Sequence, residues 1–529
     1  MRKRRIVAIV SVFLLLGVVS WLVLTYVILP PDGELKVQTT DVIGTVNQLV
    51  GVNDYGPDVT GLYEDQVGYD LFRDLGLQRL RVWCQFGAQL AWGLGWGWYH
   101  TIFNGSSMAD AQNSNFYNWT YLDILFEVVN QTGAQPILTF NGCPRSIAQD
   151  GMPNKPPLNY DVYAEVVARV LMHYTQDWPG GSGHTYSIDY VEIGNEPNLE
   201  PFWNGSSQEF FDLYAVVSQR LDQLGGTFKI GGPGLADAGL HQWTTDFLSN
   251  VSAGNLPLDF FSWHSYWENP VQVVLSMQVV KDVLIANGYG DIERVFDEWG
   301  LNLLSEVGWG TMQGALHATG VLTVAAHQGI NITCFAVSKD APVHPDFSGL
   351  FGEEANFGLL TRNPTIPKPI YHALKPFVTV TGNPILQTTL IPQPALAFLP
   401  YYLTYLTTQG EGLYNYTVLV ANHGLRTIRC RITLEGAPQA TYHVQTRELS
   451  DASLTQYNDW TPPTTEETGE IIVQFPPQSV IWIEIYTSGP YVILSCRSSV
   501  QVQLFAIASD VTYLKLQIAV KQGYAICST

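Results

Sequence analysis

The sequence is poor in charged residues, and basic residues are the scarcest of them. Only 14% of the 529 positions carry a charged side chain, and 26 Lys and Arg residues stand against 47 Asp and Glu residues. A nucleic-acid partner requires a basic stripe that neutralises phosphates, so we expect none. The net charge of -21 instead suits the surface of a soluble, exported domain.

Cysteine is also scarce, and the six cysteines form no CxxC pair. A thiolate zinc site is therefore not expected. The histidines follow neither an HxxxH nor an HxH spacing, so we predict no catalytic metal and no other cofactor. The GxSxG motif of a serine nucleophile elbow is missing as well. Outside the cell, Cys84 with Cys143 and Cys496 with Cys527 are the first disulfides to test, although spacing does not fix the pairing.

One long uncharged run stands at the N-terminus. Four basic residues at positions 2–5 precede 24 uncharged residues at positions 6–29, which is long enough to span a bilayer. The basic stub should remain in the cytoplasm, which places the rest of the chain outside the cell. The run ends at Pro30 and Pro31 without a small-x-small cleavage pattern. We therefore expect residues 1–31 to form a transmembrane anchor; a cleaved signal and a secreted chain are the alternative.

Acceptor triplets for N-glycosylation are consistent with export to the cell surface as an extracellular glycoprotein. The seven triplets begin at Asn104, Asn118, Asn130, Asn204, Asn250, Asn331 and Asn415.

Short β-rich runs alternate with longer helical patterns between residues 40 and 380. The eight runs cover residues 49–53, 79–83, 136–141, 190–195, 228–232, 260–266, 294–299 and 332–337. Helical patterns lie between them, for example over 160–174 and 311–328. Eight such units predict an α/β fold with a (β/α)8 TIM barrel over residues 40–380. A doubly wound sheet is the alternative, but no glycine-rich phosphate loop follows the first run.

The texture of the sequence changes after the barrel. Helical periodicity fades, and short β-rich runs separated by Pro and Gly predict a β-sandwich over residues 381–487. Within it, residues 459–469 are rich in Thr, Pro and Glu and should form an exposed loop. Residues 488–529 are an additional β-rich C-terminal segment.

Two glutamates follow apolar runs at positions where a barrel keeps its chemistry. Glu196 ends the fourth run in an Asn-Glu-Pro motif, and Glu298 ends the seventh. The carboxyl ends of the strands form the catalytic face of such barrels. Cleavage of a glycosidic bond requires one protonated and one ionised carboxyl on either side of the bond. The pair therefore predicts a glycoside hydrolase in which Glu196 and Glu298 are the two carboxyls that cleave the bond.

The residues around Glu196 also resemble those of a known family. The Asn-Glu-Pro motif and the Glu of the seventh run look like the large clan of (β/α)8 retaining glycosidases. Within that clan, the run from Glu192 to Trp203 is similar to glycoside hydrolase family 39, which includes β-xylosidases and α-L-iduronidases. Residues 210–214 and 262–266 continue the likeness.

The resemblance implies that Glu196 is the acid/base and Glu298 the nucleophile, and it implies roles for further side chains. The implied substrate-binding residues are Asn195, Arg81, His264, Tyr266 and Trp299. Asn195 would hydrogen-bond the 2-hydroxyl of the sugar, and Tyr266 would donate to Glu298. Arg81 would keep Glu298 ionised by Coulomb attraction, with a structural ion pair to another acid as the alternative. His264 would line the same pocket, unless it is a satisfied histidine of the barrel wall.

The sequence departs from the family pattern at two places. Gly194 stands where family 39 commonly has a bulkier aromatic residue, and the motif also resembles heparanase-like and arabinofuranosidase-like members of the clan. The eighth run lacks the Trp that often forms the sugar platform. We expect Lys339, just after that run, to lie at the surface, and a contact with an acidic sugar is the alternative.

These patterns together predict retaining hydrolysis of O-glycosidic bonds in oligo- or polysaccharides, with β-xylosidase-like specificity. An endo-acting β-glucanase and a heparanase- or glucuronidase-like hydrolase are alternatives within the clan, and the same residues would serve a transglycosylase. A non-catalytic surface protein that binds carbohydrate is the alternative from another class. Neither the sugar nor the oligomeric state follows from the sequence.

Overall fold

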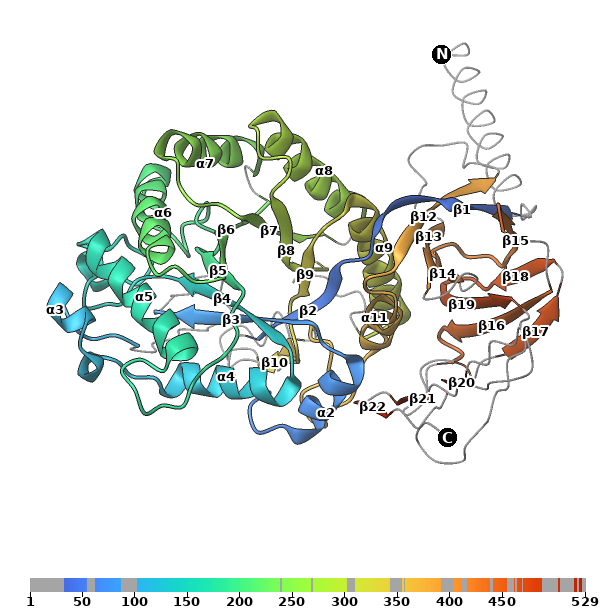
Figure 1. Ribbon diagram of the computed structural model, residues 1–529, viewed down its shortest axis with the longest axis horizontal. Helices are drawn as coiled ribbons and strands as arrows, with labels where there is room; N and C mark the ends of the chain where they lie inside the picture. The colour runs from blue at the N-terminus through green and yellow to red at the C-terminus, as the bar shows by residue number, and fades with distance from the viewer. Residues whose placement is uncertain are drawn as a thin grey trace, which may run out of the picture.

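The computed structural model contains a closed barrel and a strand-rich region that follows it (Figure 1). The residues that it describes are 33–54, 62–86, 102–237, 240–267, 270–301, 310–342, 354–355, 357–391, 403–410, 416–437, 441–453, 461, 464–468, 470–487, 503–504, 518–520 and 523–525. Among them, no helix combines the length and the apolar character needed to cross a bilayer. Residues 1–31, to which the anchor prediction refers, lie outside this described part of the chain.

Eight parallel strands close the barrel, so this part of the predicted fold is confirmed. The strands are β2 (Gln48–Asp54), β3 (Arg79–Gln85), β4 (Gln135–Asn141), β5 (Tyr190–Ile193), β6 (Lys229–Leu235), β7 (Phe260–Tyr266), β8 (Glu293–Gly300) and β9 (Ile332–Phe335). Each of the eight β-rich runs in the sequence coincides with one of them. Their apolar side chains are buried on both faces, as expected for a parallel sheet covered by helices.

A helix follows every barrel strand and packs on the outside. These helices are α2 (Gln66–Leu75), α4 (Thr120–Thr132), α5 (Tyr160–Gln176), α6 (Ser207–Asp222), α7 (Leu240–Gly254), α8 (Pro270–Ala286), α9 (Met312–Gln328) and α11 (Pro369–Thr379). Local chemistry sets their starts. Ser206 and Glu209 form a reciprocal capping box at α6, and the side chain of Asn159 caps α5. Shorter elements are α3 (Met108–Ala111), η2 (Ser114–Phe116), η3 (Gln149–Gly151), β10 (Ala341–Pro342) and β11 (Glu354–Ala355).

The strand-rich region is built on one continuous nine-stranded sheet, where we expected the two separate sheets of a sandwich. Its order is β17-β16-β19-β14-β13-β12-β1-β15-β18. The strands are β1 (Gly33–Thr45), β12 (Pro384–Ile391), β13 (Leu403–Gln409), β14 (Tyr416–Asn422), β15 (Ile428–Glu435), β16 (Tyr442–Leu449), β17 (Thr464–Thr468), β18 (Ile471–Phe475) and β19 (Ser479–Thr487). The sheet curls so that β18 approaches β14 and β19, and it encloses a second apolar core.

Strand β1 corrects the expected boundary between the two regions. It pairs with β12 and β15 of the C-terminal sheet, so residues 40–45 do not belong to the barrel. Strand β17 corrects a second expectation. Part of the loop expected over 459–469 is an edge strand that pairs with β16, because threonines suit an exposed edge. Within 488–529, the described residues are those of β20 (Gln503–Leu504), β21 (Ile518–Val520) and β22 (Gly523–Ala525), which form a small antiparallel sheet.

The two regions share an apolar interface, in which α9 packs against β13, β14, β19 and β1. Strand β14 shows how one strand serves both cores. Val418 and Val420 point into the core of the sheet, whereas Leu419 and Ala421 belong to the core of the barrel. This alternation follows from the two-residue period of a strand.

The described cysteines contradict one expected disulfide. Cys84 and Cys143 are buried free thiols, so the disulfide suggested between them is wrong; Cys496 and Cys527 lie outside the described residues.

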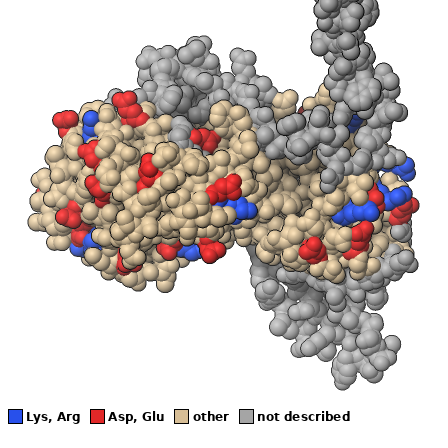
Figure 2. Space-filling model, turned by 90° about the horizontal axis from the view of Figure 1, so that it is seen from above, with Lys and Arg blue, Asp and Glu red and all other residues tan. Residues whose placement is uncertain are grey.

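On the face drawn in Figure 2, acidic and basic side chains are scattered, and most of the described surface carries neither.

Candidate active site

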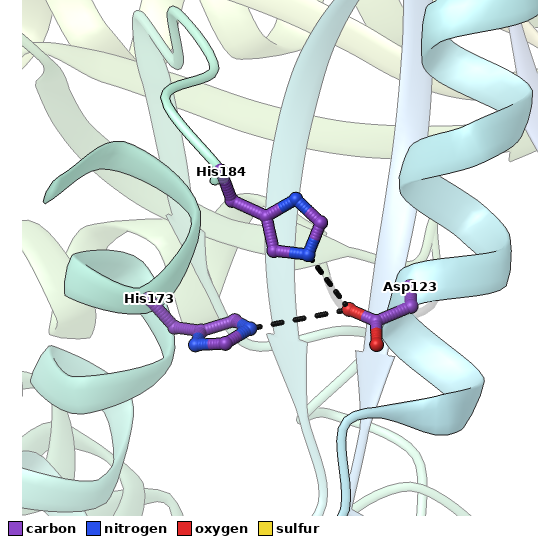
Figure 3. Close-up of side chains that lie close together, drawn as sticks. All are labelled: Asp123, His173 and His184. Carbon is purple, nitrogen blue, oxygen red and sulfur yellow. Dashed lines mark ion pairs between the residues drawn. The ribbon is translucent and has the colours of Figure 1, made fainter. Parts of the chain in front are cut away.

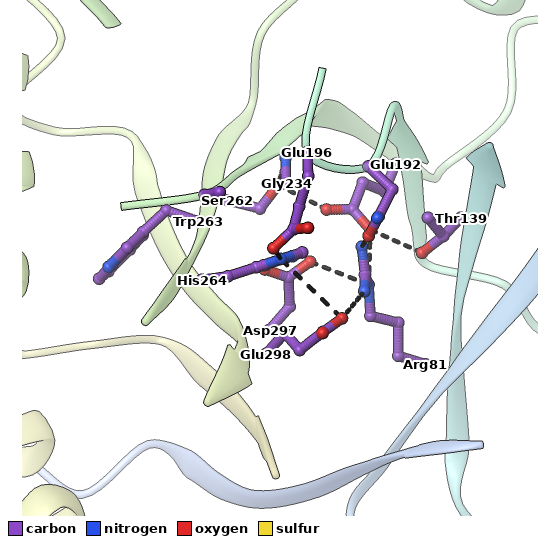
Figure 4. Close-up of polar contacts among 12 residues, drawn as sticks. Arg81, Thr139, Glu192, Glu196, Gly234, Ser262, Trp263, His264, Asp297 and Glu298 are labelled. Carbon is purple, nitrogen blue, oxygen red and sulfur yellow. Dashed lines mark hydrogen bonds and ion pairs between the residues drawn. The ribbon is translucent and has the colours of Figure 1, made fainter. Parts of the chain in front are cut away.

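Six of the seven candidate residues meet at the carboxyl ends of the barrel strands. Figure 4 shows four of them, which are Arg81, Glu196, His264 and Glu298. Glu196 follows β5, and Glu298 lies near the end of β8. One carboxylate oxygen of Glu196 and one of Glu298 lie within 4.8 Å of each other. The pair is therefore close enough to act on the two sides of one bond.

The backbone presents Glu196 in an unusual conformation. Its φ of 44° lies in the left-handed region, which costs free energy for a residue with a side chain. The amide of Glu196 donates to the carbonyl of Gly234 on β6 at 2.7 Å, which holds the turn in place. Gly194 also has a positive φ, of 106°, and a Cβ there would lie 2.7 Å from the Phe210 ring. The glycine is thus required by this turn.

Arg81 is the centre of the site and is completely buried. Its Nη1 donates to Glu298 Oε2 at 2.9 Å and its Nη2 donates to Asn195 Oδ1 at 3.0 Å. Its Nε donates to Glu192 Oε2 at 2.8 Å. Arg81 thus contacts Glu298 and also pairs with another acid, as the alternative expected. The buried cation favours ionised carboxylates around it.

Glu298 is fixed from two directions. Arg81 contacts one carboxylate oxygen, and the hydroxyl of Tyr266 donates a hydrogen bond to the other. The side chain remains 9% exposed, so its carboxylate still faces the mouth of the barrel. The two contacts fix the position of the Glu298 carboxyl, as a nucleophile requires.

Glu196 has the opposite electrostatic environment. Burial raises the pKa of Glu196 to about 7, and the charge of Arg81 only partly offsets this effect. Its Oε1 lies 2.9 Å from His264 Nδ1. Burial also lowers the pKa of His264 to about 4, so this imidazole is neutral at neutral pH. Glu196 can therefore keep its proton near neutral pH, while the neighbouring carboxyl of Glu298 is paired with Arg81.

Glu192 and Asp297 form a buried acid pair that the sequence reasoning missed. Glu192 accepts hydrogen bonds from Arg81, Thr139 and Ser262. Burial alone would raise the pKa of Glu192, but Arg81 and these donors outweigh it and lower the pKa to about 2. Burial and the adjacent Glu192 charge raise the pKa of Asp297 well above its ordinary value. Within this pair, protonation is therefore favoured on Asp297 over Glu192.

An irregularity in β8 brings Asp297 and Glu298 to the same side. Consecutive residues of a strand normally face opposite sides. The register of β8 shifts between Phe296 and Trp299 relative to β9, as in a β-bulge, and both acids reach Arg81. The signal in the sequence was an acidic residue next to the candidate nucleophile at the end of an apolar strand.

Trp299 and Lys339 lie elsewhere than expected. Trp299 is 1% exposed and packs in the apolar core against Phe335, so it does not reach the barrel mouth. Lys339 is not a surface lysine, because it is 3% exposed and its ammonium contacts Asp65 and Thr365. Neither residue is placed to contact a sugar bound at Glu298.

Asp237 and Trp267 extend the site beyond Glu196. Trp267 is 39% exposed and follows β7, and its indole N–H donates to Asp237. Burial raises the pKa of Asp237 to about 6, and the charge of Glu196 adds to this shift. Asp237 and Trp267 line an open depression together with residues of α7 and α8. An exposed indole beside the acid/base candidate supplies an apolar face against which a sugar ring can stack.

One metal-ligating set occurs in the site itself. Glu196, His264 and Glu298 each offer an atom within 4.8 Å of the other two. Arg81 already neutralises Glu298 at 2.9 Å, and a bound cation would have to displace or repel this guanidinium. The residues present therefore suit an acid and a nucleophile better than a metal centre.

The family to which the chain is similar becomes evident from comparison with known sequences. The model of glycosyl hydrolases family 39 matches residues 97–399. A β-xylosidase of Geobacillus stearothermophilus is 28% identical over 165 residues, which is 30% of this chain and 32% of that protein. A β-xylosidase of Caldicellulosiruptor saccharolyticus is 22% identical over 160 residues, or 29% and 31% of the two chains. The matches thus span about a third of the curated relatives' length.

Solved structures share the fold over a larger part of the chain. A glucosidase from Croceicoccus marinus has a TM-score of 0.64 at 14% identity and covers 87% of this chain and 100% of its own. A monomeric β-xylosidase from Caulobacter crescentus has a TM-score of 0.60 at 15% identity, with 86% and 100% covered. The family 39 enzyme from Xanthomonas axonopodis pv. citri has a TM-score of 0.59 at 17% identity, with 87% and 98% covered. Since the family model covers more than half of the sequence, the chain belongs to glycosyl hydrolase family 39.

Proposed function

We propose that this protein hydrolyses O-glycosidic bonds of oligo- or polysaccharides with retention of anomeric configuration. The observation that carries the proposal is the spacing of Glu196 and Glu298, whose nearest ligand atoms lie within 4.8 Å. Retaining enzymes keep their two carboxyls about 5–5.5 Å apart, whereas inverting enzymes leave about 6.5–9.5 Å for a water molecule. Membership of family 39 supports the same reaction class.

The electrostatics support the proposed division of roles. In the first step Glu298 attacks the anomeric carbon, the bond to the leaving oxygen breaks, and Glu196 gives that oxygen its proton. The negative charge of Glu298 then disappears into an ester and no longer repels an ionised Glu196, so Glu196 loses its proton more easily. In the second step Glu196 accepts a proton from water, which attacks the ester and restores Glu298.

Asn195 is oriented to bind the sugar next to Glu298. Its Oδ1 accepts from Arg81, which can only donate, so its amide nitrogen faces away from the guanidinium. Among the described residues that buried nitrogen has no hydrogen-bond partner. A sugar hydroxyl would satisfy it, and the bond would strengthen as charge develops in the transition state.

The proposed substrate is a β-xyloside. The β-xylosidases that the chain resembles support this choice, at 28% and 22% identity. The depression at Asp237 and Trp267 lies on the side of Glu196, where the leaving group must sit. We propose that Trp267 stacks on the sugar or aglycone that departs.

The decisive experiment measures hydrolysis of aryl β-xylosides, β-glucosides and β-glucuronides by the wild type and by Glu298→Ala. The wild type should release the β-anomer first, as followed by proton NMR. Glu298→Ala should lose activity by on the order of 10³-fold or more. Azide should then restore bond cleavage and yield the α-glycosyl azide. Glu200→Ala, at an exposed acid four residues beyond Glu196, is the matched control and should retain activity.

Each other result has a definite meaning. Release of the α-anomer would show inversion, and full activity of Glu298→Ala would refute its role as nucleophile. No cleavage of any glycoside by a folded wild type would indicate a carbohydrate-binding protein without catalysis. Transfer to sugar acceptors in place of water would indicate a transglycosylase.

The proposal also places the enzyme at the cell membrane, with residues 1–31 as anchor and the barrel outside. It is supported by the basic stub at positions 2–5 and the uncharged run at 6–29. Protease added to intact cells should remove the activity, and detergent should be needed to extract it. Activity in the cell-free medium would instead indicate cleavage and secretion.

A further inference from the structure

Three metal-ligating side chains converge on the helical layer, away from the barrel mouth. Asp123 is in the first turn of α4, His173 is in the last turn of α5, and His184 is in the connection from α5 to β5. Figure 3 shows both imidazole rings with a nitrogen directed at the Asp123 carboxylate. One ligand atom of each residue lies within 4.8 Å of the other two. These three residues are called the Asp123 cluster below.

The spacing of the cluster matches that of a small cation's ligands. His184 Nε2 lies 3.3 Å and His173 Nε2 lies 3.9 Å from the same oxygen, Oδ1 of Asp123. Zinc binds imidazole nitrogen and carboxylate oxygen at about 2.0–2.1 Å, so its tetrahedral ligands stand about 3.3 Å apart. The pair of His184 and Asp123 already has this spacing, whereas His173 Nε2 would have to approach Asp123 by roughly half an ångström.

His173 supplies an independent sign of a missing ligand. Its ring is 3% exposed, and its Nδ1 lies 2.6 Å from the carbonyl oxygen of Trp178. A carbonyl only accepts, so the proton of the neutral ring is on Nδ1 and Nε2 carries a lone pair. That buried Nε2 has no hydrogen-bond partner among the described residues. A lone pair fixed by a carbonyl on the opposite nitrogen is the usual state of a histidine that binds a metal.

The surrounding rings hold two of the ligands in place. His173 stacks on Trp119 with ring centroids 3.8 Å apart and an interplanar angle of 3°. The hydroxyl of Tyr174 donates to Asp123 Oδ1 at 2.8 Å and orients the carboxylate. These contacts are the supporting interactions that a metal site needs around its ligands.

The connection that carries His184 is also ordered by its own contacts. The carboxylate of Asp177 accepts from the amides of Gly181 and Gly183 at 3.0 and 2.8 Å. This turn brings His184 back to the cluster. An Asp–His ion pair alone would explain His184, but it would leave the lone pair of His173 unused.

Charge and access favour a divalent cation at this place. The side chains of Asp123 and His184 are 42% and 25% exposed, so an ion and a water ligand can enter. Two imidazoles and one carboxylate form a borderline-soft set, which suits zinc better than calcium or magnesium.

We propose that the Asp123 cluster is a zinc site in which His173, His184 and Asp123 hold the ion and water completes the tetrahedron. The ion joins α4, α5 and the connection at 177–189. The site lies apart from Glu196 and Glu298, and it acts on stability without taking part in glycoside cleavage.

The test is a calorimetric titration of the EDTA-stripped full chain with ZnCl2, together with thermal unfolding with and without zinc. The wild type should bind about one Zn²⁺ at this site and unfold at a higher temperature when zinc is present. His184→Gln and Asp123→Asn should each weaken binding by at least about 100-fold and abolish the thermal shift. Both side chains are partly exposed, so both variants should fold.

Two control variants make the result specific. Glu298→Gln removes the other metal-ligating set, at the barrel mouth, and should leave zinc binding unchanged. His443→Gln alters a histidine in β16 of the distant sheet and should also bind like the wild type. The proposal is overturned if the wild type shows no zinc binding, or if His184→Gln and Asp123→Asn bind zinc as the wild type does.

Discussion

The proton of Glu196 sets an upper pH limit on the proposed reaction. Burial raises the pKa of this carboxyl to about 7, so the acid form is present below that pH and is lost above it. We predict that kcat/KM for substrates with poor leaving groups falls tenfold per pH unit above about pH 7. A pH–rate profile with an alkyl or methyl-substituted phenyl β-xyloside measures this limb.

The control uses a leaving group that needs no proton. With a dinitrophenyl β-xyloside, Glu196→Gln should retain bond cleavage, and the decline above pH 7 should disappear. An unchanged decline in Glu196→Gln would assign the limb to a different group.

Asp297 makes the stability of the protein depend on pH. Its pKa is raised by burial and by Glu192, so the folded state binds a proton that the unfolded state releases above about pH 4. Stability contributed by this proton is complete below that pH and declines as the pH rises, by up to about 1.4 kcal/mol per unit. Asp297→Asn keeps a donor for Glu192 and takes up no proton. Urea unfolding at pH 5, 6, 7 and 8 should show a smaller decline for this variant than for the wild type.

A matched substitution separates this effect from a general change of charge. Asp246→Asn alters an exposed acid on α7 and should leave the pH dependence as in the wild type. Equal slopes for Asp297→Asn and the wild type would mean that Asp297 is ionised in the folded protein.

The sequence predicted the residues at strand ends better than those inside strands. Glu196 and Glu298 follow apolar runs, and parallel strands gather such ends at one face. Glu192 lies between Val191 and Ile193, and nothing in this local sequence shows that the side chain of Glu192 faces a buried cation, Arg81. Its signal was an acid within an apolar strand, which must be paired when it is buried.

The helices and strands of the barrel follow from periodicity, but the irregularities that shape the site do not. Each of the eight predicted strands is present. They could be predicted because apolar runs of this length alternate with helical patterns in the sequence. The register shift in β8 inserts a residue without any local signature, and it moves Asp297 into the site and Trp299 into the core. The expectation that Trp299 binds substrate failed for this reason.

The glycine in β6 gives a prediction at the level of the element. Gly234 has a φ of 62°, and a Cβ there would lie 3.1 Å from Glu192, 3.2 Å from Arg81 and 3.3 Å from His264. Gly234→Ala should therefore disturb the buried network and lower kcat/KM by on the order of 10- to 100-fold. Steady-state kinetics with an aryl glycoside measures the loss.

Gly133 provides the matched control for backbone strain. It ends α4 with a φ of 74°, and a Cβ there would meet nothing within 4 Å. Gly133→Ala should cost about 1 kcal/mol in stability while kcat/KM stays at the wild-type value. An equal loss of activity in both variants would show that strain, and not contact with the network, causes it.

The arrangement of the whole molecule departs most from the order of the sequence. Strand β1 precedes the barrel, yet it lies between β12 and β15 in the C-terminal sheet. Its partners in β12 and β15 are more than 330 positions away, and nothing in the local pattern of residues 33–45 distinguishes them from a barrel strand. Along the sequence, the barrel therefore lies between two parts of one sheet. We expect the barrel and the strand-rich region to unfold together for this reason.

Gly320 of α9 tests this coupling at the interface. A Cβ at this position would lie 3.3 Å from the His423 ring in the C-terminal region. Gly320→Leu would force the two surfaces apart and should destabilise the protein by about 1–3 kcal/mol. Gln313→Leu, at an exposed position of the same helix, should leave stability nearly unchanged. If the regions are coupled, activity and circular dichroism of Gly320→Leu fall together in one urea transition at a lower midpoint. Loss of the sheet at low urea with full activity retained would show instead that the barrel stands alone.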